Sequence, residues 1–260
     1  MFNKLSRKIF EKLYFLFFKE LLANKNGAYF LVRKENYQLR DALRNDFENI
    51  FYNLESNINK NTIFIDIGAN IGIATCLLAN KSKLCISIEP CTSTFIQLVR
   101  NIQRNKFANV IPIKALIDKK SGIENMTSIP FSGINQKKEH IKDNPYISES
   151  IIKNQYEQVL AISLDTLLFS FLEDQYSFSK QINLVIKLDV ERNEINVLKG
   201  AAKLLNLDIP IVISVDSFSQ DNHNEIEKII ANYGFAKLET KFEDNDLFFS
   251  NYKKTNKKSP

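Results

Sequence analysis

The segment TIFIDIGANIG, residues 62–72, places an acid and two spaced glycines directly after an apolar run. Gly68 lets the backbone turn sharply, and Gly72 lets a following helix begin close to a bound molecule. Asn70, between them, tolerates a left-handed backbone conformation. In an open parallel sheet, ligands bind outside the carboxyl ends of the strands. The segment therefore predicts a turn that holds a ligand, with Asp66 at the strand exit.

Glu89 follows the next apolar run, KLCISIE, and lies 21 residues after Gly68 (89 − 68). A carboxylate at about this offset accepts hydrogen bonds from ribose hydroxyls in nucleotide-binding folds. The glycine spacing is not that of a dinucleotide site, because its third and sixth places hold Asn70 and Ile73. The carboxylate of Asp66 repels a pyrophosphate but attracts an ammonium and a sulfonium. S-adenosylmethionine is a ligand of that kind, and an N-cap is the alternative role for Asp66.

The catalytic candidates lie in the segment VIKLDVE, where Lys187, Asp189 and Glu191 alternate and are expected to point to one side of a strand. With S-adenosylmethionine bound at the turn, transfer of its methyl group to an alcohol would require that the hydroxyl face the sulfonium methyl and lose its proton. Asp189 or Glu191 is the candidate base, and Lys187 would orient the hydroxyl or pair with a carboxylate. The alternative is an ion pair that merely ties strand to helix. Glu194 follows in the first helical turn as a candidate for binding the substrate, although the macrodipole alone favours an acid there.

The surrounding pattern is that of an α/β fold. After residue 61, short apolar runs alternate with amphipathic stretches, which is typical of βαβ units and of a mostly parallel sheet with helices on both faces. Strands are expected at TIFIDI, KLCISIE, NVIPIKALI, INLVIKLDV, IPIVISVD and DLFFSN, and one helix at NEINVLKGAAKLL. We assign residues 61–250 to this domain and residues 251–260 to a basic flexible tail.

Residues 1–60 are expected to form a helical extension or cap, because apolar positions recur at three and four, with a break near Asn26-Gly27. Basic residues interleave with apolar ones in the first helix, so weak peripheral contact with a membrane is the alternative to packing on the domain. The longest apolar run there is too short for a signal peptide or a membrane span. Residues 124–158 are polar and aperiodic, and we expect a binding loop or lid.

The net charge of +5 is concentrated at the two ends of the chain. Residues 1–25 carry six basic and two acidic side chains, which gives +4, and the last eight residues carry four lysines. The body between them is therefore −3 (5 − 8). A mildly acidic body is a poor surface for tracking phosphates, so a nucleic acid substrate is not expected.

Cys76, Cys85 and Cys91 are odd in number and form no Cys-x-x-Cys pair. The first two lie inside apolar runs, where cysteine behaves as a small hydrophobe, so we expect a reducing compartment and a cytoplasmic protein. His140 and His223 are far apart and have no ligand-spaced partners, so no zinc site is predicted.

Four segments together resemble the successive motifs of the FkbM-type S-adenosylmethionine-dependent methyltransferases: FIDIGANIGIAT, SIEPCTSTFIQLVRNIQRN, AISLDTLL and LVIKLDVERNEINVLKGAAKLL. The resemblance spans about residues 60–216 and implies a Rossmann-like class I methyltransferase fold. It implies O-methylation of a small-molecule or glycan acceptor, at a hydroxyl of a sugar, a glycan precursor or a secondary metabolite. It also implies cofactor contacts: the methionine end against Asp66, Gly68, Asn70 and Gly72, the ribose against Glu89, and the adenine near Asp118.

The chain departs from the family pattern at Arg192, where glycine is usual. Arginine there would crowd the acceptor site, or supply a cation for an anionic acceptor such as a phosphorylated or acidic sugar. Asp216 stands where the family more often has glutamate, and it would bind acceptor or metal, or remain a solvated loop acid. A divalent cation held by Asp189, Glu191 and Asp216 would lower the pKa of an acceptor hydroxyl. Two rival functions remain: an S-adenosylmethionine-binding protein that has lost catalysis, and a nicotinamide-dependent reductase, which the glycine spacing disfavours.

Overall fold

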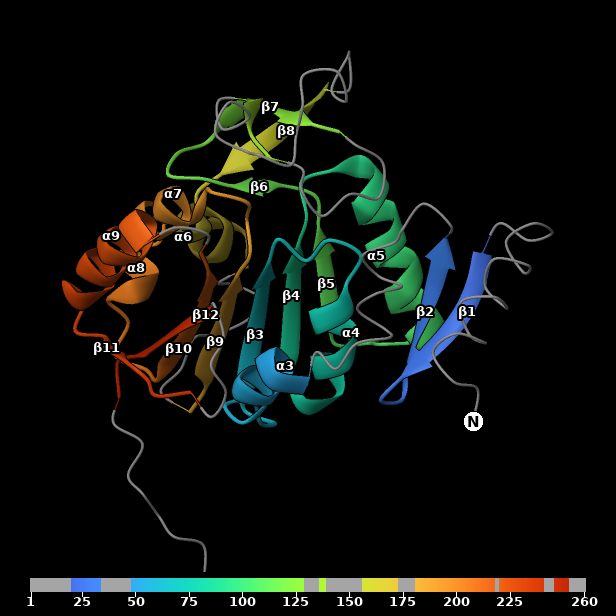
Figure 1. Ribbon diagram of the computed structural model, residues 1–260, viewed down its shortest axis with the longest axis horizontal. Helices are drawn as coiled ribbons and strands as arrows, with labels where there is room; N and C mark the ends of the chain where they lie inside the picture. The colour runs from blue at the N-terminus through green and yellow to red at the C-terminus, as the bar shows by residue number, and fades with distance from the viewer. Residues whose placement is uncertain are drawn as a thin grey trace, which may run out of the picture.

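The computed structural model describes residues 20–33, 48–128, 136–138, 156–172, 181–217, 220–240 and 246–252. Within them, a central sheet of seven strands has the order β11-β12-β10-β9-β3-β4-β5 (Figure 1). Neighbouring strands from β10 to β5 pair in parallel, and β12 pairs antiparallel with β10 and β11. The expected mostly parallel sheet, with DLFFSN as a closing strand, is therefore confirmed. The strands are β3 (Thr62–Ile67), β4 (Leu84–Ile88), β5 (Val110–Ile113), β9 (Asn183–Leu188), β10 (Ile211–Asp216), β11 (Ala236–Lys237) and β12 (Asp246–Ser250).

Helices cover both faces of this sheet. On one face, α3 (Glu48–Glu55) and α4 (Ile73–Leu78, continued by the 3₁₀ turn Ala79–Lys81) share a core with the strands, and α5 (Thr92–Asn105) packs beside them. Five short or medium helical segments pack on the other face: α6 (Leu164–Thr166), the π-helical η3 (Leu167–Leu172), α7 (Glu194–Lys199), α8 (Ala202–Leu205) and α9 (Gln220–Ala231).

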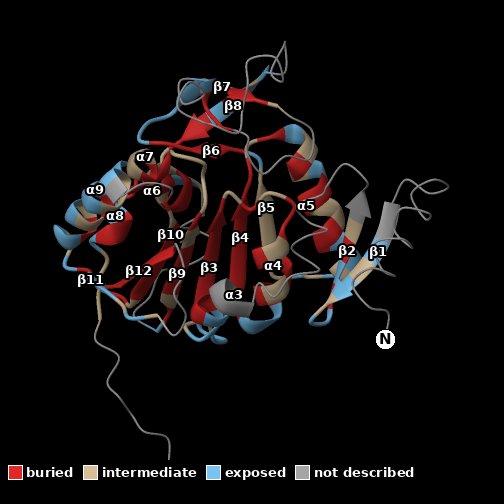
Figure 2. Ribbon diagram, in the orientation of Figure 1, coloured by how far each residue is buried: buried red, intermediate tan, exposed pale blue. Residues whose placement is uncertain are grey.

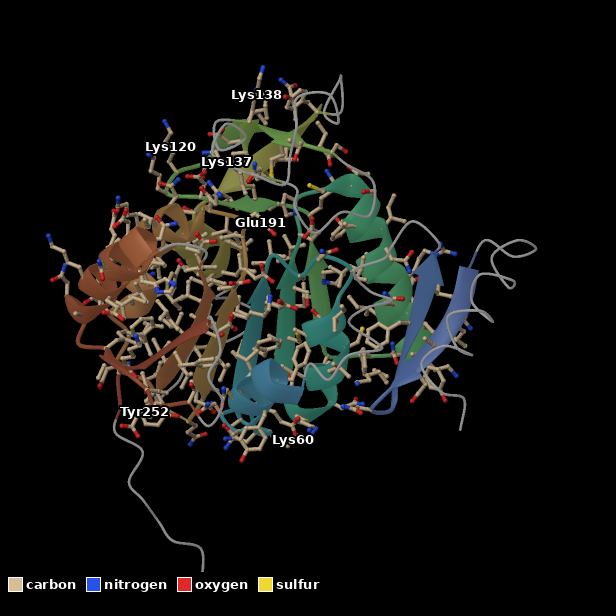
Figure 3. All side chains as sticks on the ribbon, in the orientation of Figure 1. Lys60, Lys120, Lys137, Lys138, Glu191 and Tyr252 are labelled. Atoms are coloured by element: carbon tan, nitrogen blue, oxygen red, sulfur yellow. The ribbon has the colours of Figure 1, made fainter. Side chains whose placement is uncertain are left out.

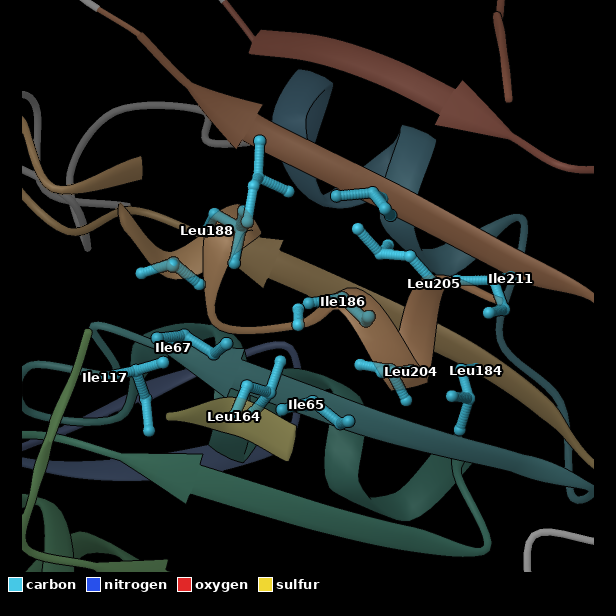
Figure 4. Packing of buried hydrophobic residues seen from close by; sticks show 14 of the residues in the cluster. Ile65, Ile67, Ile117, Leu164, Leu184, Ile186, Leu188, Leu204, Leu205 and Ile211 are labelled. Atoms are coloured by element: carbon cyan, nitrogen blue, oxygen red, sulfur yellow. The ribbon is translucent and has the colours of Figure 1, made fainter. Parts of the chain in front are cut away.

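The core explains why the strands appear in the sequence as unbroken apolar runs. Ile63, Ile65 and Ile67 of β3 point into the larger cluster, which Figure 4 shows from close by, whereas Phe64 points to the α3–α4 side. A parallel sheet with helices on both faces buries both sets of side chains. Figure 2 accordingly shows the central strands almost entirely as buried. The three cysteines are also buried and unpaired, as expected of small apolar side chains.

A second sheet of three strands lies beyond the carboxyl ends of the central strands (Figure 1). It consists of β6 (Leu116–Ile117), β8 (Tyr156–Ile162) and β7 (Gly122–Thr127), in that order. The expected loop at residues 124–158 is therefore wrong at both ends, where strands bury Met126, Val159 and Ala161 in a small cluster. A bridge from Met126 to Lys137 adds to this sheet. The rest of that loop lies outside the described residues.

The expected N-terminal helical cap is wrong at residues 20–33. These residues form an antiparallel hairpin of β1 (Glu20–Lys25) and β2 (Ala28–Arg33), which lies beside α5 in Figure 1. Asn26 and Gly27 both have positive φ, 49° and 83°, as a two-residue hairpin turn requires. Helix α3 agrees with the helical expectation at the end of the extension. The first expected helix before residue 20 lies outside the described residues, as do residues 253–260 of the tail.

The segment NEINVLKGAAKLL forms two helices, α7 and α8, rather than the single helix expected. A Cβ atom at Gly200 would lie 2.3 Å from the carbonyl oxygen of Asp118, so the chain passes too close to its neighbour there for any larger residue. Asp165 stabilises the restart, because its carboxylate accepts hydrogen bonds from the N–H groups of Lys203 (2.7 Å) and Leu204 (2.9 Å). In the described part of the chain, no helix has the length and apolar character needed to cross a bilayer.

Candidate active site

The turn after β3 is shaped by three positive φ angles, at Gly68 (79°), Asn70 (51°) and Gly72 (86°). A Cβ atom at Gly68 would lie 1.8 Å from the carbonyl oxygen of Asp189, and one at Gly72 would lie 2.5 Å from Leu98 Cδ1. Both positions therefore need glycine for conformation and for space. The sharp turn expected from the sequence is present, and it lies against β9 on one side and α5 on the other.

Glu89 lies at the end of β4, beside this turn, and is almost fully buried. Its Oε2 accepts a hydrogen bond from the N–H of Asn70 (2.9 Å). Its Oε1 accepts from the N–H of Cys91 (3.0 Å) and from Thr94 Oγ1 (2.7 Å). Burial raises the pKa of Glu89, and these hydrogen bonds oppose the increase. Glu89 therefore fixes the turn, and its contact with a ribose hydroxyl stays a prediction from the sequence.

Asp66 is fully buried, and its carboxylate points into the protein rather than toward an open surface. Its Oδ2 accepts hydrogen bonds from the N–H (3.1 Å) and the Oγ1 (2.6 Å) of Thr75, in the first turn of α4. Thr75 Oγ1 also lies 2.8 Å from Ser87 Oγ. Burial raises the pKa of Asp66. Asp66 of β3 therefore accepts a hydrogen bond from a backbone N–H in the first turn of α4. This contact resembles the N-cap role that the sequence offered as the alternative.

Lys187 of β9 lies opposite Asp66 in the parallel register. Its Nζ is 2.9 Å from Asp189 Oδ2 and 3.8 Å from Asp66 Oδ1, which has no hydrogen-bond partner among the described residues. Burial lowers the pKa of Lys187, but the charges of Asp189 and Asp66 outweigh it and hold the pKa above its usual value. The ion pair that the sequence offered as an alternative is thus present.

The expectation that Lys187, Asp189 and Glu191 share one side of a strand is wrong, because β9 ends at Leu188. Glu191 and Arg192 form a turn in which both residues have positive φ, 48° and 75°. A left-handed conformation at Arg192 explains why glycine is usual at this place. In Figure 3, Glu191 appears between the carboxyl ends of the central strands and the small sheet.

Glu191 has the most perturbed environment of this turn. Burial raises its pKa to about 9, and the charges of Asp189, Asp216 and Glu194 contribute in the same direction. A carboxyl group with this pKa is protonated at neutral pH. Once it has lost that proton, its carboxylate is a stronger base than an ordinary glutamate and can serve as a general base.

Glu194 is buried and accepts a hydrogen bond at Oε1 from the N–H of Arg192 (3.0 Å). Burial raises its pKa to about 7. Its contact is with the turn itself, so the structure gives it a supporting role. Asp216 is half-buried at the end of β10, paired in register with Asp246 of β12. Asp246 was missed in the sequence, because nothing there places the closing strand antiparallel beside β10.

Asp118, expected near the adenine, has a different set of contacts. It is buried, its Oδ2 lies 2.9 Å from Lys137 Nζ, and its Oδ1 accepts from the N–H of Lys119 (2.6 Å). Lys137, labelled in Figure 3, is also 3.8 Å from Glu124. The carboxylate therefore anchors the small sheet. Lys137 could not be identified from the sequence, because it lies in an aperiodic polar segment.

Among the described residues, carboxylates outnumber cations where β3, β9, β10 and β12 meet. The charged groups there are Asp66, Asp189, Glu191, Glu194, Asp216 and Asp246, together with Lys187 and Arg192. Across the residues that the structure places, no three histidine, cysteine, aspartate or glutamate side chains are arranged to hold a metal ion. The arrangement thus gives no support to a divalent metal ion between Asp189, Glu191 and Asp216. The excess of carboxylates does favour an organic ligand that carries positive charge.

Comparison with known proteins agrees with this geometry. The sheet order and the glycine turn define a Rossmann-like class I methyltransferase fold. The family model described as the methyltransferase FkbM domain matches residues 66–237, more than half of the 260-residue chain. The chain belongs to the FkbM methyltransferase family, and its cofactor is S-adenosylmethionine. The resemblance noted in the sequence is thereby confirmed.

No curated protein matches the chain. Among solved structures, M. jannaschii TYW2 in complex with AdoMet is 14% identical, with 89% of this chain and 84% of that chain covered and a TM-score of 0.40. Precorrin-6y C5,15-methyltransferase from Geobacter metallireducens GS-15 is 10% identical, with 77% and 85% covered and a TM-score of 0.42. These overlays are distant, and the assignment rests on the family match.

Proposed function

We propose that the protein transfers the methyl group of S-adenosylmethionine to a hydroxyl of a sugar, a glycan precursor or a secondary metabolite. The observation that carries this proposal is the position and protonation of Glu191. It follows β9 directly, next to the glycine turn, and its pKa is raised to about 9. Methylation of an alcohol needs a proton acceptor beside the reacting oxygen, whereas an already nucleophilic acceptor would not.

The positive charge of the bound cofactor would convert Glu191 into a base. A sulfonium bound near the acidic cluster lowers the pKa of Glu191, because opposite charges favour the carboxylate. S-adenosylmethionine would supply an electrophilic methyl group, which its sulfonium sulfur would release to become a neutral thioether. Glu191, having lost its own proton to solvent when the cofactor binds, would take up the hydroxyl proton as the acceptor oxygen bonds to the methyl carbon. Loss of the sulfonium charge raises the pKa of Glu191 again, so the carboxyl group retains the proton.

Asp189 and Lys187 act differently in this scheme. Asp189 Oδ2 lies 2.9 Å from Lys187 Nζ, so its carboxylate is engaged, whereas no described residue forms a hydrogen bond or ion pair with the carboxyl group of Glu191. Asp189 is therefore the weaker candidate base, and Lys187 holds it in place. Arg192 adds a cation beside the base, which we propose contacts an anionic group of the acceptor, such as the phosphate or carboxylate of a modified sugar.

The test uses S-adenosylmethionine with a ¹³C-labelled methyl group and a panel of neutral, phosphorylated and acidic sugars. We expect a labelled product whose methyl carbon is bonded to oxygen by NMR. Glu191→Gln should lower kcat by about 10²- to 10⁴-fold while leaving the affinity for S-adenosylhomocysteine nearly unchanged. Glu239→Gln, an exposed acid outside the site, is the matched control and should retain full turnover. Full turnover in both Asp189→Asn and Glu191→Gln, or a label on nitrogen, would refute the proposal.

A cofactor-binding protein without catalysis is the second candidate, favoured by Arg192 at a position of positive φ where the family has glycine. It predicts that S-adenosylhomocysteine binds and that no acceptor is methylated in wild type, whereas Arg192→Gly gains turnover. The reductase alternative has lost its basis, because the chain belongs to a methyltransferase family.

We further propose a cytoplasmic location, supported by three cysteines that are buried and unpaired. Peripheral membrane contact through the N-terminal basic segment and the absence of a nucleic acid substrate stay predictions from the sequence.

A further inference from the structure

A row of three amides connects helix α5 to the N-terminal hairpin. Gln97, Asn101 and Asn105 recur every four residues and therefore lie on one face of the helix. Gln97 and Asn101 are buried, at 1% and 0% exposure. Buried amides of this kind are expensive unless they are hydrogen-bonded, so their partners identify what they hold.

The partners are backbone groups on one edge of β2. Asn105 Oδ1 accepts from the N–H of Tyr29 (2.8 Å), and Asn105 Nδ2 donates to the carbonyl of Tyr29 (2.7 Å). Asn101 Oδ1 accepts from the N–H of Leu31 (2.9 Å), and Gln97 Nε2 donates to the carbonyl of Leu31 (2.8 Å). Residues two apart in a strand direct their backbone groups to the same edge. Helix α5 thus pairs with β2 through its side chains, much as a further strand would through its backbone.

Asn101 alone of these three amides also reaches the cofactor turn. Its Nδ2 donates to the carbonyl oxygen of Ile71 at 2.8 Å. Ile71 lies between Asn70 and Gly72, both of which have positive φ. The turn is therefore held from two sides, by Glu89 on the N–H of Asn70 and by Asn101 on the next carbonyl.

The hairpin also supports the turn by apolar contact. Phe30 is fully buried, and it clusters with Ala28, Ile71 and Cys76. Residues 20–33 lie outside the segment matched by the family model, which begins at residue 66. The hairpin is thus not part of the matched segment, and it touches the domain at the cofactor turn.

We infer that Asn101 is a positioning residue for S-adenosylmethionine, and that the β1–β2 hairpin acts through it and through Phe30 to hold the cofactor turn in its binding conformation. Left-handed backbone conformations persist only where the surroundings impose them. Without the Asn101 amide, the carbonyl of Ile71 loses a buried partner and the turn opens locally more often. Cofactor affinity falls as the fraction of protein with a formed turn decreases.

The decisive variant is Asn101→Asp, which keeps the shape and the oxygen that faces Leu31 but replaces the donor facing Ile71 by an acceptor. Asn105→Asp is the matched control. It makes the same exchange on the same helix face, but the donor that it removes serves the carbonyls of Tyr29 and Asn101 and not the turn.

Both full-length variants are titrated with S-adenosylhomocysteine by calorimetry and followed by hydrogen–deuterium exchange. We expect N101D to weaken binding by roughly tenfold or more and to accelerate exchange in the peptide covering the turn. N105D should bind within about twofold of wild type, with faster exchange confined to the hairpin and the end of α5. Unchanged affinity in N101D, or an equal loss in both variants, would overturn the inference.

Phe30→Leu keeps the inference testable if N101D does not fold. It leaves every amide in place and thins only the apolar contact beneath Ile71. Weaker binding of S-adenosylhomocysteine together with faster exchange in the turn peptide supports the role of the hairpin. Wild-type affinity in F30L contradicts it.

Discussion

The turns after β3 and after β9 follow neighbouring parallel strands and are built in opposite ways. The turn after β3, residues 68–72, takes its positive φ angles at two glycines and an asparagine, and its backbone groups are bonded by Glu89 and Asn101. The turn after β9, residues 189–193, has its positive φ angles at Glu191 and Arg192, which are costly in that conformation. Both turns meet at one point, where Gly68 lies against the carbonyl of Asp189.

The two turns also differ in charge. Around the first, each carboxylate accepts hydrogen bonds from N–H or O–H groups, which stabilise its charged form. Around the second, burial and the charges of Asp189, Asp216 and Glu194 raise the pKa of Glu191 to about 9. A rigid, satisfied turn is suited to binding, whereas a strained turn with repelling acids is suited to a step in which a proton moves. We therefore propose that the first turn holds the cofactor and that the second turn takes part in the reaction.

Gly68→Ala should break the point where the turns meet, and it has the largest expected effect. The added Cβ would lie 1.8 Å from a backbone oxygen, which cannot rotate away. We expect a loss of about 4 kcal/mol or more in the free energy of unfolding, together with loss of S-adenosylhomocysteine binding. Denaturant unfolding and calorimetric titration measure the two effects.

Gly234→Ala is the control for backbone strain. Gly234 has the same φ of 79°, but a Cβ atom there would meet nothing within 4 Å. It should cost only about 1–2 kcal/mol. Equal losses in the two variants would mean that the two turns are not in close contact.

Lys187→Met tests the charge that both turns share. The variant keeps the length of the side chain but leaves Asp66 buried without its cation, and frees Asp189. Removing one partner of a buried pair costs about 3–5 kcal/mol, which denaturant unfolding would show. Lys199→Met removes an exposed lysine, 3.3 Å from Glu225, and should cost at most about 1 kcal/mol. A small loss at Lys187 would mean that Asp66 is stabilised by Thr75 alone.

Much of the first turn could be predicted from the sequence, because its determinants are local. The apolar run of β3, the glycine spacing and the acid at the end of β4 lie within 30 residues of one another. A glycine in a turn indicates a backbone with positive φ, so the conformation could be inferred from the residue type. Glu89 was therefore placed correctly beside the turn.

The second turn was predicted less well, because its conformation is imposed by the fold. Alternation of Lys187, Asp189 and Glu191 indicated a strand, and arginine at position 192 hid a left-handed residue that glycine would have marked. Hydrogen-bond partners that are distant in the sequence could not be predicted either. Asn101 was not singled out in the sequence, because its partners Leu31 and Ile71 lie 70 and 30 residues away.

The hairpin was missed for another reason. Apolar residues at Leu21, Leu22, Phe30 and Leu31 fit helical spacing as well as alternation, so periodicity alone could not decide between helix and strand. The Asn26-Gly27 dipeptide was interpreted as a helix break, although Asn-Gly between apolar runs is the strongest short signal for a hairpin.

The pH dependence of stability should reveal the repulsion in the second turn. In the unfolded chain Glu191 titrates near its ordinary pKa of 4.5, and in the fold near 9. Between these values the folded state binds a proton that the unfolded state has released, so stability falls as pH rises through this window. Glu191→Gln should match wild type near the lower end and become more stable toward the upper end, by up to about 1.4 kcal/mol per pH unit.

Denaturant unfolding at about pH 5, 7 and 9 measures this divergence. Glu194, whose pKa is raised to about 7, contributes a slope of the same sign to both proteins below that pH. A Glu191→Gln curve parallel to wild type would show that Glu191 is ionised in the fold throughout this range.

Arg192→Gly has the smallest expected effect. It tests whether the strained arginine in the second turn contributes to acceptor binding. Arg192 has φ of 75°, and glycine should relieve about 1 kcal/mol of backbone strain, seen as a higher denaturant midpoint. Lys106→Gly, at φ of 57° beyond the end of α5, should give a similar gain in stability without changing the site.

If Arg192 binds an anionic acceptor, its removal raises KM for phosphorylated or acidic sugars and leaves KM for neutral sugars unchanged. A gain in stability with no change in any KM would mean that the arginine has no part in acceptor choice, and that the second turn owes its reactivity to the carboxylates alone.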